Sequence, residues 1–377
     1  MRRREDILRR FGAGGGIIAE LLEYNSSLYT LPEHFEWIFP FEDENFVPVW
    51  EGYERETREK GVFETLRSKL VQLSFSIQDG ISKTSPYTDA TLRGVPIGDI
   101  PEAKGLNLVE EERLELFLTS SAAGRLPVLL ARNRSDFINL VRALAYRNEP
   151  AEVPESMGSL ILAGYNNWDR LRSYREQWER EHPTDSWQDE FSTIASKKEL
   201  YQDKFILLSD SPYSGVKAES LGMDEDGWKE LSYKIRLGHE LCHYFCKRVL
   251  LSMRNNALDE LLADYCGIVN ARGSFLSDWL LRFLGLEDPS AYRRGGRLEN
   301  YTKDLSEEAF AVLCRIVEAA ASNLEELDAC LPRDQLAPYK VLMTLSFFTL
   351  EELASSDAVS ALKEKYEEVQ NNWRIRL

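Results

Sequence analysis

His239, Glu240 and His243 are the residues best suited to chemistry, because they form the pattern His-Glu-x-x-His inside an apolar repeat of helical period. At 3.6 residues per turn, both histidines lie on one face of a helix, about one turn apart, and both imidazoles can reach one metal ion. Glu240 lies about a quarter-turn away, where it can deprotonate a water that the metal activates. The pattern predicts a Zn²⁺ site with Glu240 as the catalytic base.

A third protein ligand is needed, because two imidazoles do not complete a zinc site. A second helix is expected over residues 256–271, and Glu260 and Asp264 share one of its faces. We expect Glu260 to bind the metal, while Asp264 accepts a hydrogen bond from the far nitrogen of a ligand histidine and so fixes its tautomer. A site in which Asp264 is the third ligand is the alternative.

The two motifs together resemble those of a known group of zinc enzymes. His-Glu-x-x-His on one helix and Glu-x-x-x-Asp on the next are similar to the pattern of the zincin-type metallopeptidases called gluzincins, which include the thermolysin type. The resemblance covers residues 235–268. The resemblance implies a zincin-like helix pair in which His239, His243 and Glu260 are the metal ligands. It also implies that Glu240 is the general base and that Asp264 supports one of the ligand histidines.

The chain departs from that group at the residue that stabilises the oxyanion. In thermolysin-like enzymes a histidine or tyrosine beyond the metal helices has this role, and here no histidine follows His243. The upstream His34 and His182 are expected to be surface or core residues. The candidate donors that remain are Tyr265, Tyr292 and Tyr301.

Arginines near the motif are candidates for holding an anionic end of a substrate. The segment 292–297 is a basic cluster with two glycines in a strongly acidic chain, and its Arg294 and Arg297 can bind carboxylates or phosphates in a two-pronged fashion. Arg236, about one turn before His239, can do the same. The predicted substrate-binding residues are therefore Arg236, Arg294, Arg297 and Tyr301. The alternative for the segment 292–297 is a solvated loop that offsets neighbouring acidic residues, and the alternative for Arg236 is an ion pair.

The five cysteines are odd in number and lie inside apolar helical patterns, which does not fit a disulfide framework. A reducing compartment is therefore expected. Cys242 and Cys246 are four residues apart beside the histidines, so a thiolate role is an alternative to the small, buried apolar role that we expect for them.

The front half of the chain predicts a small mixed sheet with helices against it. Short runs rich in β-branched residues predict strands, and longer amphipathic stretches predict helices. The predicted strands are 71–77, 127–131, 159–163 and 204–208, and the clearest helices are 136–146 and 168–181. The glycines at 12–16 are expected to form a hinge, not a phosphate loop.

The back half is almost wholly helical in pattern. Helices are predicted at 226–253, 256–271, 275–284, 306–320 and 349–370, and two capping boxes are predicted at Ser322 with Glu325 and at Thr349 with Glu352. The fold class is therefore α+β, with a mixed α/β region over 1–190 and a mainly helical metal-binding region over 191–377, or one continuous domain.

The whole chain excludes several classes of partner. Its net charge is −17, which repels the phosphates of nucleic acids and anionic lipids. Every apolar run is interrupted by polar or charged residues before it reaches the length of a membrane-spanning helix, and the charged start does not have the pattern of a signal peptide. A cytoplasmic protein without nucleic-acid or membrane partners is expected.

Three functions remain on these grounds. The first is a metallohydrolase that cleaves a peptide or other amide bond, with Glu240 moving the proton of the attacking water to the leaving nitrogen. The second is a small-molecule metalloenzyme, such as a lyase, a cyclase or a non-peptide hydrolase. The third is a structural protein in which zinc clamps two helices, although structural zinc usually has four protein ligands.

Overall fold

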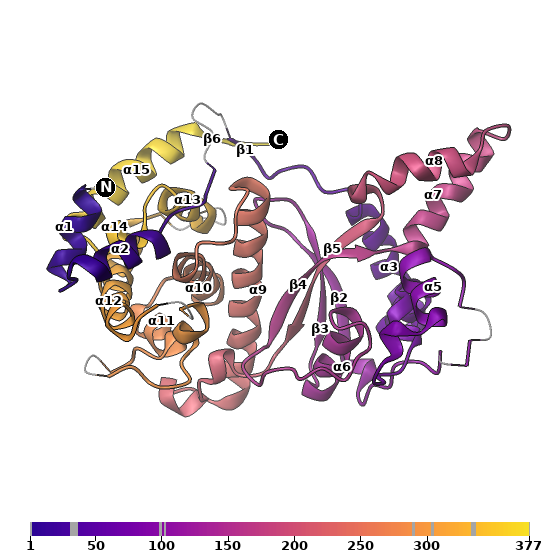
Figure 1. Ribbon diagram of the computed structural model, residues 1–377, viewed down its shortest axis with the longest axis horizontal. Helices are drawn as coiled ribbons and strands as arrows, with labels where there is room; N and C mark the ends of the chain where they lie inside the picture. The colour runs from indigo at the N-terminus through magenta and orange to yellow at the C-terminus, as the bar shows by residue number, and fades with distance from the viewer. Residues whose placement is uncertain are drawn as a thin grey trace. The chain divides into compact units, whose positions relative to one another are not determined.

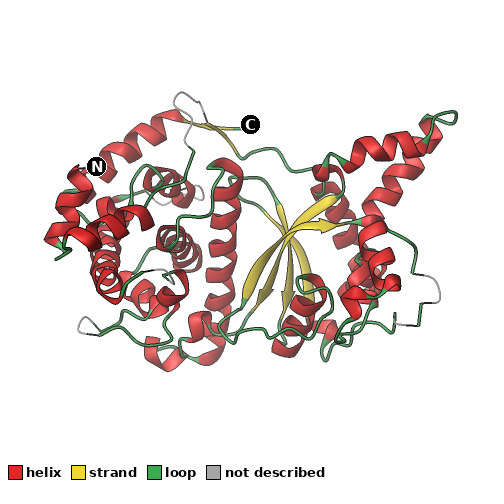
Figure 2. Cartoon of the chain, in the orientation of Figure 1, coloured by secondary structure: helices red, strands yellow, loops and turns green. Residues whose placement is uncertain are grey.

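The computed structural model describes residues 2–30, 37–97, 100–101, 103–288, 291–302, 305–332 and 337–376. Helices make up 59% of the chain and strands 10%, so the α+β class predicted from the sequence is confirmed (Figure 2). The chain forms two compact units, one made of residues 42–211 and one made of 1–41 together with 212–377. The sequence-based division at residue 190 differs from this one, because the packing of residues 1–41 against the C-terminal helices is a long-range contact without a local pattern.

The unit of residues 42–211 is built on a four-stranded sheet with the order β2-β3-β5-β4. β3 and β5 are parallel, and both outer strands are antiparallel to their neighbours. All six side chains of β3 are buried, as expected for a central strand covered on both faces. The strands are β2 (Leu114–Thr119), β3 (Leu126–Ala131), β4 (Ser159–Asn166) and β5 (Gln202–Ser209).

Helices cover this sheet and its connections. α6 packs on β3 and β5, while α3 and α4 pack on β2. The α-helices of this unit are α3 (Val47–Lys60), α4 (Val62–Lys69), α5 (Ser85–Arg93), α6 (Arg134–Leu144), α7 (Trp168–Glu181) and α8 (Trp187–Ala195). The 3₁₀ turns are η1 (Val71–Ser74), η2 (Ile81–Lys83), η3 (Glu111–Arg113) and η4 (Lys198–Leu200).

Most elements predicted in the front half are confirmed. The runs at 127–131, 159–163 and 204–208 are β3, β4 and β5, and the two helices are α6 and α7. The strand predicted at 71–77 is wrong: it begins as the 3₁₀ turn η1, and its apolar side chains are buried against helices without a strand partner. β2 was not predicted. Its register with β3 is set by tertiary pairing, which its short sequence does not reveal.

The other unit is mainly helical. Figure 1 shows the N-terminal helices among the C-terminal ones, in agreement with contacts of α1 with α14 and of α2 with α12. Its α-helices are α1 (Arg2–Arg10), α2 (Gly15–Tyr24), α9 (Glu225–Val249), α10 (Ala257–Arg272), α11 (Ser277–Leu284), α12 (Glu307–Cys330), α13 (Ala337–Leu345), α14 (Leu350–Leu353) and α15 (Ala358–Asn372). A parallel pair of strands, β1 (Trp37–Phe39) and β6 (Trp373–Ile375), joins the two ends of this unit.

Three 3₁₀ turns lie near the candidate site: η5 (Tyr213–Gly215) and η6 (Ala218–Leu221) before α9, and η7 (Arg297–Tyr301) between α11 and α12. The N-cap of α9 is Asp224, whose side chain accepts a hydrogen bond from the Gly227 amide at 2.8 Å. This N-cap satisfies one of the free amides of the first turn. The long helix that carries the His-Glu-x-x-His motif therefore has a defined start.

α9 and α10 pack at a crossing made of glycines. A Cβ atom on Gly238 would lie 2.9 Å from the Cα of Gly267, and a Cβ on Gly267 would lie 2.6 Å from the carbonyl oxygen of Ile235. Such distances are closer than real Cβ contacts, so only glycine allows this approach. The crossing lies directly before His239 and brings the two predicted metal helices together.

The back-half predictions are largely confirmed, with differences at helix ends. α12 continues ten residues past the predicted end at 320, because buried Leu324 and Leu327 extend its apolar stripe. Ser322 therefore lies inside the helix, and its predicted capping box is wrong. The box at Thr349 is confirmed, since the Thr349 amide donates to the Glu352 carboxylate at 2.9 Å.

The C-terminal helices differ from the prediction in two ways. The helix predicted at 349–370 is divided into α14 and α15, and α13 was not predicted. No helix in the described ranges has both the length and the apolar character needed to cross a membrane.

Candidate metal centre

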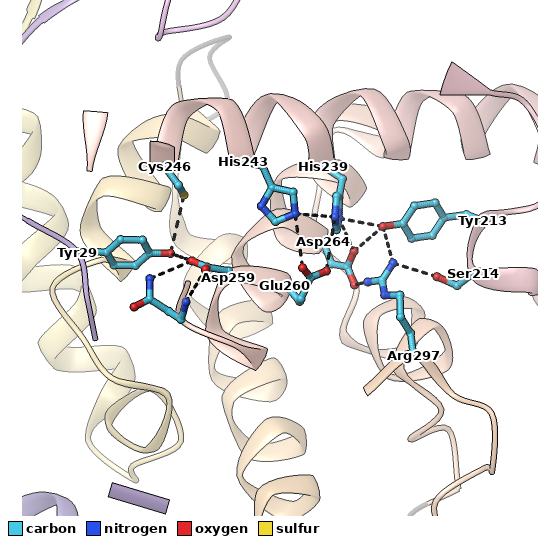
Figure 3. Close-up of polar contacts among 11 residues, drawn as sticks. Tyr29, Tyr213, Ser214, His239, His243, Cys246, Asp259, Glu260, Asp264 and Arg297 are labelled. Atoms are coloured by element: carbon cyan, nitrogen blue, oxygen red, sulfur yellow. Dashed lines mark hydrogen bonds and ion pairs between the residues drawn. The ribbon is translucent and has the colours of Figure 1, made fainter. Parts of the chain in front are cut away.

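His239, His243 and Glu260 meet at one point between α9 and α10 (Figure 3). The Nε2 atoms of the two histidines are 3.0 Å apart. Each Nε2 atom is 3.6 Å from an oxygen of Glu260. Both histidines are buried, and Glu260 has a side-chain exposure of 15%. The structure therefore brings together the three residues that the sequence predicts as ligands.

The spacing of these three donor atoms fits a small metal ion. In a tetrahedral zinc site with bonds of about 2.0–2.1 Å, two ligand atoms are about 3.3 Å apart. The distances of 3.0, 3.6 and 3.6 Å lie on both sides of that value. Among the described residues, this is the one group of three such side chains whose ligand atoms lie within 4.8 Å of one another. Two imidazoles and one carboxylate would leave a fourth position open.

Asp264 contacts the other ring nitrogen of His239, Nδ1, whereas Glu260 lies near Nε2 (Figure 3). His239 donates from Nδ1 to the Oδ1 atom of Asp264 at 2.9 Å, because an ionised carboxylate can only accept. The lone pair of His239 is thereby left on Nε2, where the other donors meet. Asp264 is fully buried, and its oxygens are hydrogen-bonded to Nδ1 of His239, to Tyr213 and to Arg297. This geometry favours Glu260 over Asp264 as the third ligand.

Arg297 reaches Asp264 from η7. Its guanidinium forms an ion pair with Oδ2 of Asp264, and it also donates to the Tyr213 hydroxyl at 2.8 Å and to the Ser214 hydroxyl at 3.1 Å. Only 14% of the Arg297 side chain is exposed. The predicted role of Arg297 as a substrate-binding residue does not agree with this placement, because its charge is already neutralised by a buried carboxylate.

The other two predicted arginines lie elsewhere. Arg236 is buried, donates to the carbonyl oxygen of Pro212 at 2.9 Å, and places its guanidinium carbon 5.4 Å from the centre of the Tyr213 ring. Arg294 is exposed in the loop before η7. The structure thus places Arg236 beside Tyr213 and Arg294 on the surface.

Charges in this cluster shift the pKa values of its members. Burial raises the pKa of Asp264, but Arg297 and His239 lower it by more, so Asp264 stays ionised. Burial lowers the pKa of His239, but the hydrogen bond to Asp264 and the charge of Glu260 raise it by more. Burial and the neighbouring His239 lower the pKa of His243, which favours its neutral form. A neutral imidazole is the form that binds metals.

Glu240 and one of the predicted tyrosines lie near the donor cluster. Glu240 is buried on α9, and its charge raises the pKa of His243. Tyr301 is mostly buried, which raises its pKa well above the usual range, and the carboxylates of Glu260 and Asp264 raise it further. The phenol of Tyr301 is therefore protonated beside Glu260.

The other predicted donors are used elsewhere. Tyr265 donates to Asp328 at 2.7 Å, and Tyr292 donates to the carbonyl oxygen of Gly296 at 2.6 Å. His182 is exposed and stacks on Trp178, as expected for a surface residue. His34 lies outside the described residues. Of the three candidate tyrosines, Tyr301 is thus the one that the structure brings to the predicted ligands.

The cysteines of α9 and α10 do not provide a thiolate. All five cysteines are free, in agreement with the sequence analysis. Burial raises the pKa of Cys242 well above its usual range, and the neighbouring thiols of Cys246 and Cys266 raise it further. Cys242, Cys246 and Cys266 are all buried, as expected for small apolar side chains.

The segment before residue 30 is attached to the link between α9 and α10. Tyr29 donates to Asp259 at 2.5 Å, and the Leu28 amide donates to the side chain of Asn255 at 2.5 Å. The Tyr24 hydroxyl accepts from the Ala257 amide at 3.2 Å, at the start of α10. These contacts fix the start of α10, one turn before Glu260.

Tyr213 and Ser214 were missed by the sequence analysis. Tyr213 donates to Oδ1 of Asp264 at 2.6 Å and lies 3.0 Å from Nδ1 of His239. It precedes the motif by 26 residues, in a turn between elements. No spacing rule connects such a residue with the motif, and the sequence carries no signal that would have identified it.

Comparisons with known proteins give one result. No curated protein and no solved structure matches the chain. A family model described as a family of unknown function, DUF7005, matches residues 6–357. Because the match spans most of the chain, this protein belongs to the DUF7005 family of unknown function.

Proposed function

We propose that this protein is a zinc-dependent metallohydrolase that acts on a peptide or other amide bond. The observation that carries the proposal is the convergence of His239, His243 and Glu260, with donor atoms 3.0–3.6 Å apart. The resemblance of the two motifs to those of the gluzincins supports it. So does the buried carboxylate of Glu240, which directly follows a predicted ligand.

Zinc, when bound, would supply a Lewis acid that activates water and polarises a carbonyl group. Glu240 would accept a proton on its carboxylate from the attacking water and deliver that proton to the leaving nitrogen. This role needs a carboxylate that lies beside the ligands but is not one of them. Glu240 meets this requirement, because it is displaced by about 100° around the helix from His239.

Tyr301 is the candidate that would stabilise developing charge on the carbonyl oxygen. Its phenol keeps its proton, because burial and the nearby carboxylates raise its pKa. A protonated phenol beside the ligands can donate a hydrogen bond to an oxyanion. The free cysteines also support the proposal of a reducing, cytoplasmic location.

The proposal is tested first by metal analysis and then by substrate screening. Purified protein is analysed for metals by mass spectrometry, and a library of peptides and small amides is screened for cleavage. We expect about one zinc per chain and hydrolysis that a chelator and a hydroxamate both inhibit. Zinc that binds no hydroxamate, together with no cleavage of any amide, would favour a structural clamp and contradict the proposal.

A further inference from the structure

Asp264 accepts hydrogen bonds from three side chains, each on a different element (Figure 3). Its Oδ1 atom accepts from His239 on α9 at 2.9 Å and from Tyr213 on η5 at 2.6 Å. Its Oδ2 atom accepts from Arg297 on η7. The carboxylate itself is fully buried. A buried carboxylate is stable in its charged form only if such partners compensate for the lost solvent.

Tyr213 is held tightly in the position from which it donates. Two guanidinium groups contact its ring, with the carbons of Arg236 and Arg297 at 5.4 and 5.2 Å from the ring centre, and the ring packs edge-on against Phe283 at 4.8 Å. Its backbone amide donates to the buried hydroxyl of Ser232 at 3.0 Å. The phenol therefore has little freedom to turn away from Asp264.

The residue after Tyr213 shows that this turn is constrained. Ser214 has a φ of +51°, in the left-handed region that favours glycine. Its hydroxyl accepts a hydrogen bond from Arg297 at 3.1 Å. Backbone in this region persists where the surroundings determine it, and here the surroundings are the same arginine that binds Asp264.

Arg297 is brought to Asp264 by a close contact of two glycines. A Cβ atom on Gly296 would lie 2.6 Å from the carbonyl oxygen of Leu284 and 2.8 Å from the Cα of Gly285. The loop before η7 therefore packs directly on the end of α11. Gly296 thus allows the close approach that fixes Arg297.

We infer that Tyr213 and Arg297 are positioning residues, which set the affinity of the metal centre by holding Asp264 so that His239 keeps its proton on Nδ1 and its lone pair on Nε2. The inference rests on the proposed function, because it concerns the same metal site. It adds two residues, from two further elements, to a site that the motifs alone limit to α9 and α10. It also removes Arg297 from the set of residues available to a substrate.

The main test is the zinc affinity of Tyr213→Phe, measured by competition with a metallochromic chelator. The change removes one hydroxyl and keeps the ring, so we expect the fold to be retained and zinc to bind about 10–100-fold more weakly. The matched control is Tyr265→Phe, because Tyr265 also donates to a buried aspartate, Asp328, at 2.7 Å. The control should bind zinc with wild-type affinity.

A second pair of variants tests the charge. Arg297→Gln should weaken zinc binding, and Arg297→Lys, which keeps the positive charge, should weaken it less. The control is Arg282→Gln, which removes an exposed ion pair with Asp278 and should leave the zinc affinity unchanged. If Arg297→Gln does not fold, Tyr213→Phe alone decides. Nitrogen-15 spectra of the zinc-loaded protein supply an independent readout, since they report whether Nδ1 of His239 carries the proton.

The outcomes separate the two proposals. If wild-type protein binds zinc but Tyr213→Phe has the same affinity and the same His239 spectrum, the inference is overturned and the proposed function stands. Equal losses in Tyr213→Phe and Tyr265→Phe would mean a general effect on the fold and would also overturn it. Wild-type protein that binds no divalent metal would overturn both.

Discussion

Gly238 and Gly267 meet backbone to backbone where α9 crosses α10, so closely that a methyl group on Gly238 would lie 2.9 Å from the Cα of Gly267. Gly238 directly precedes His239 in the chain. The separation of the two helices at this point is therefore set by main-chain atoms. The distance from the imidazoles to Glu260 depends on that separation.

We expect Gly238→Ala to weaken metal binding more than any other single methyl addition in α9. The new methyl would meet Asn270 at 2.8 Å and the carbonyl oxygen of Cys266 at 3.0 Å, so the helices must move apart. Overpacking of this kind typically costs about 1–3 kcal/mol in the free energy of unfolding. Urea denaturation and zinc affinity are the measurements.

The control for that variant is Gly52→Ala in α3, where an added Cβ has no atom within 4 Å. Replacing a helical glycine at an open position should stabilise the protein by about 0.4–1 kcal/mol and leave zinc binding unchanged. Unchanged zinc affinity in Gly238→Ala would show that the glycine crossing does not determine the geometry of the site.

His239→Ala and His243→Ala are each expected to lose the metal. Removal of either imidazole leaves two ligand side chains, and a site with two ligands binds zinc far more weakly. The zinc content of dialysed protein is the measurement, with circular dichroism to establish that each variant is folded. Wild-type zinc content in both variants would exclude this cluster as the binding site.

Glu260 and Asp264 are expected to differ in the size of their effects. Glu260→Ala should lose the metal, because Glu260 is within 3.6 Å of both Nε2 atoms. Asp264→Ala should weaken metal binding or activity by about 10–100-fold, because Asp264 acts through His239. A reversed order in a zinc titration of both variants would identify Asp264 as the third ligand.

Glu240→Gln is expected to keep the fold and the metal but lose turnover. Glutamine has nearly the same size as glutamate but cannot accept the proton, and general-base catalysis is typically worth about 10²–10⁴-fold. The measurement is the rate for a substrate found by screening, with the zinc content of the same preparation. A near-normal rate at full zinc content would rule out Glu240 as the base.

Asp264 is expected to stabilise the metal-free protein in a manner that depends on pH. Asp264→Asn leaves Arg297 buried without its charged partner, which should cost about 3–5 kcal/mol at pH 7. The pKa of Asp264 is lower in the folded state than its ordinary value of 3.8. The stabilising contribution is therefore complete above that ordinary value and is lost as the pH falls through the lower folded value.

The measurement is the difference in free energy of unfolding between the wild type and Asp264→Asn, from urea denaturation at several pH values. The difference should increase as the pH falls through the raised pKa of His239, because Asp264 also stabilises the protonated imidazole, and it should decrease below about pH 4 as Asp264 itself takes up a proton. Asp278→Asn, which breaks an exposed pair with Arg282, is the control and should cost less than about 1 kcal/mol. A difference that does not decrease below about pH 4 would contradict the ion pair with Arg297.

The sequence predicted the elements with strong local patterns. α9, α10 and the central strands follow from apolar periodicity, and the cluster of His239, His243 and Glu260 follows from residue spacing on two neighbouring helices. Tyr213 and Arg297 could not be predicted, because they reach Asp264 across 51 and 33 residues of chain through turns. The strand predicted at 71–77 failed because burial without a pairing partner leaves the same apolar pattern as a strand.

The division of the chain into units has a consequence for synthesis. Residues 42–211 are contiguous, so this unit can fold as soon as it leaves the ribosome, whereas residues 1–41 must wait for residues 212–377. The pairing of β1 with β6 joins residues 37–39 to residues 373–375. During translation the N-terminal helices therefore exist for most of the time without their partners. The predicted metal ligands therefore belong to a unit that is complete only after residues 373–375 have been made.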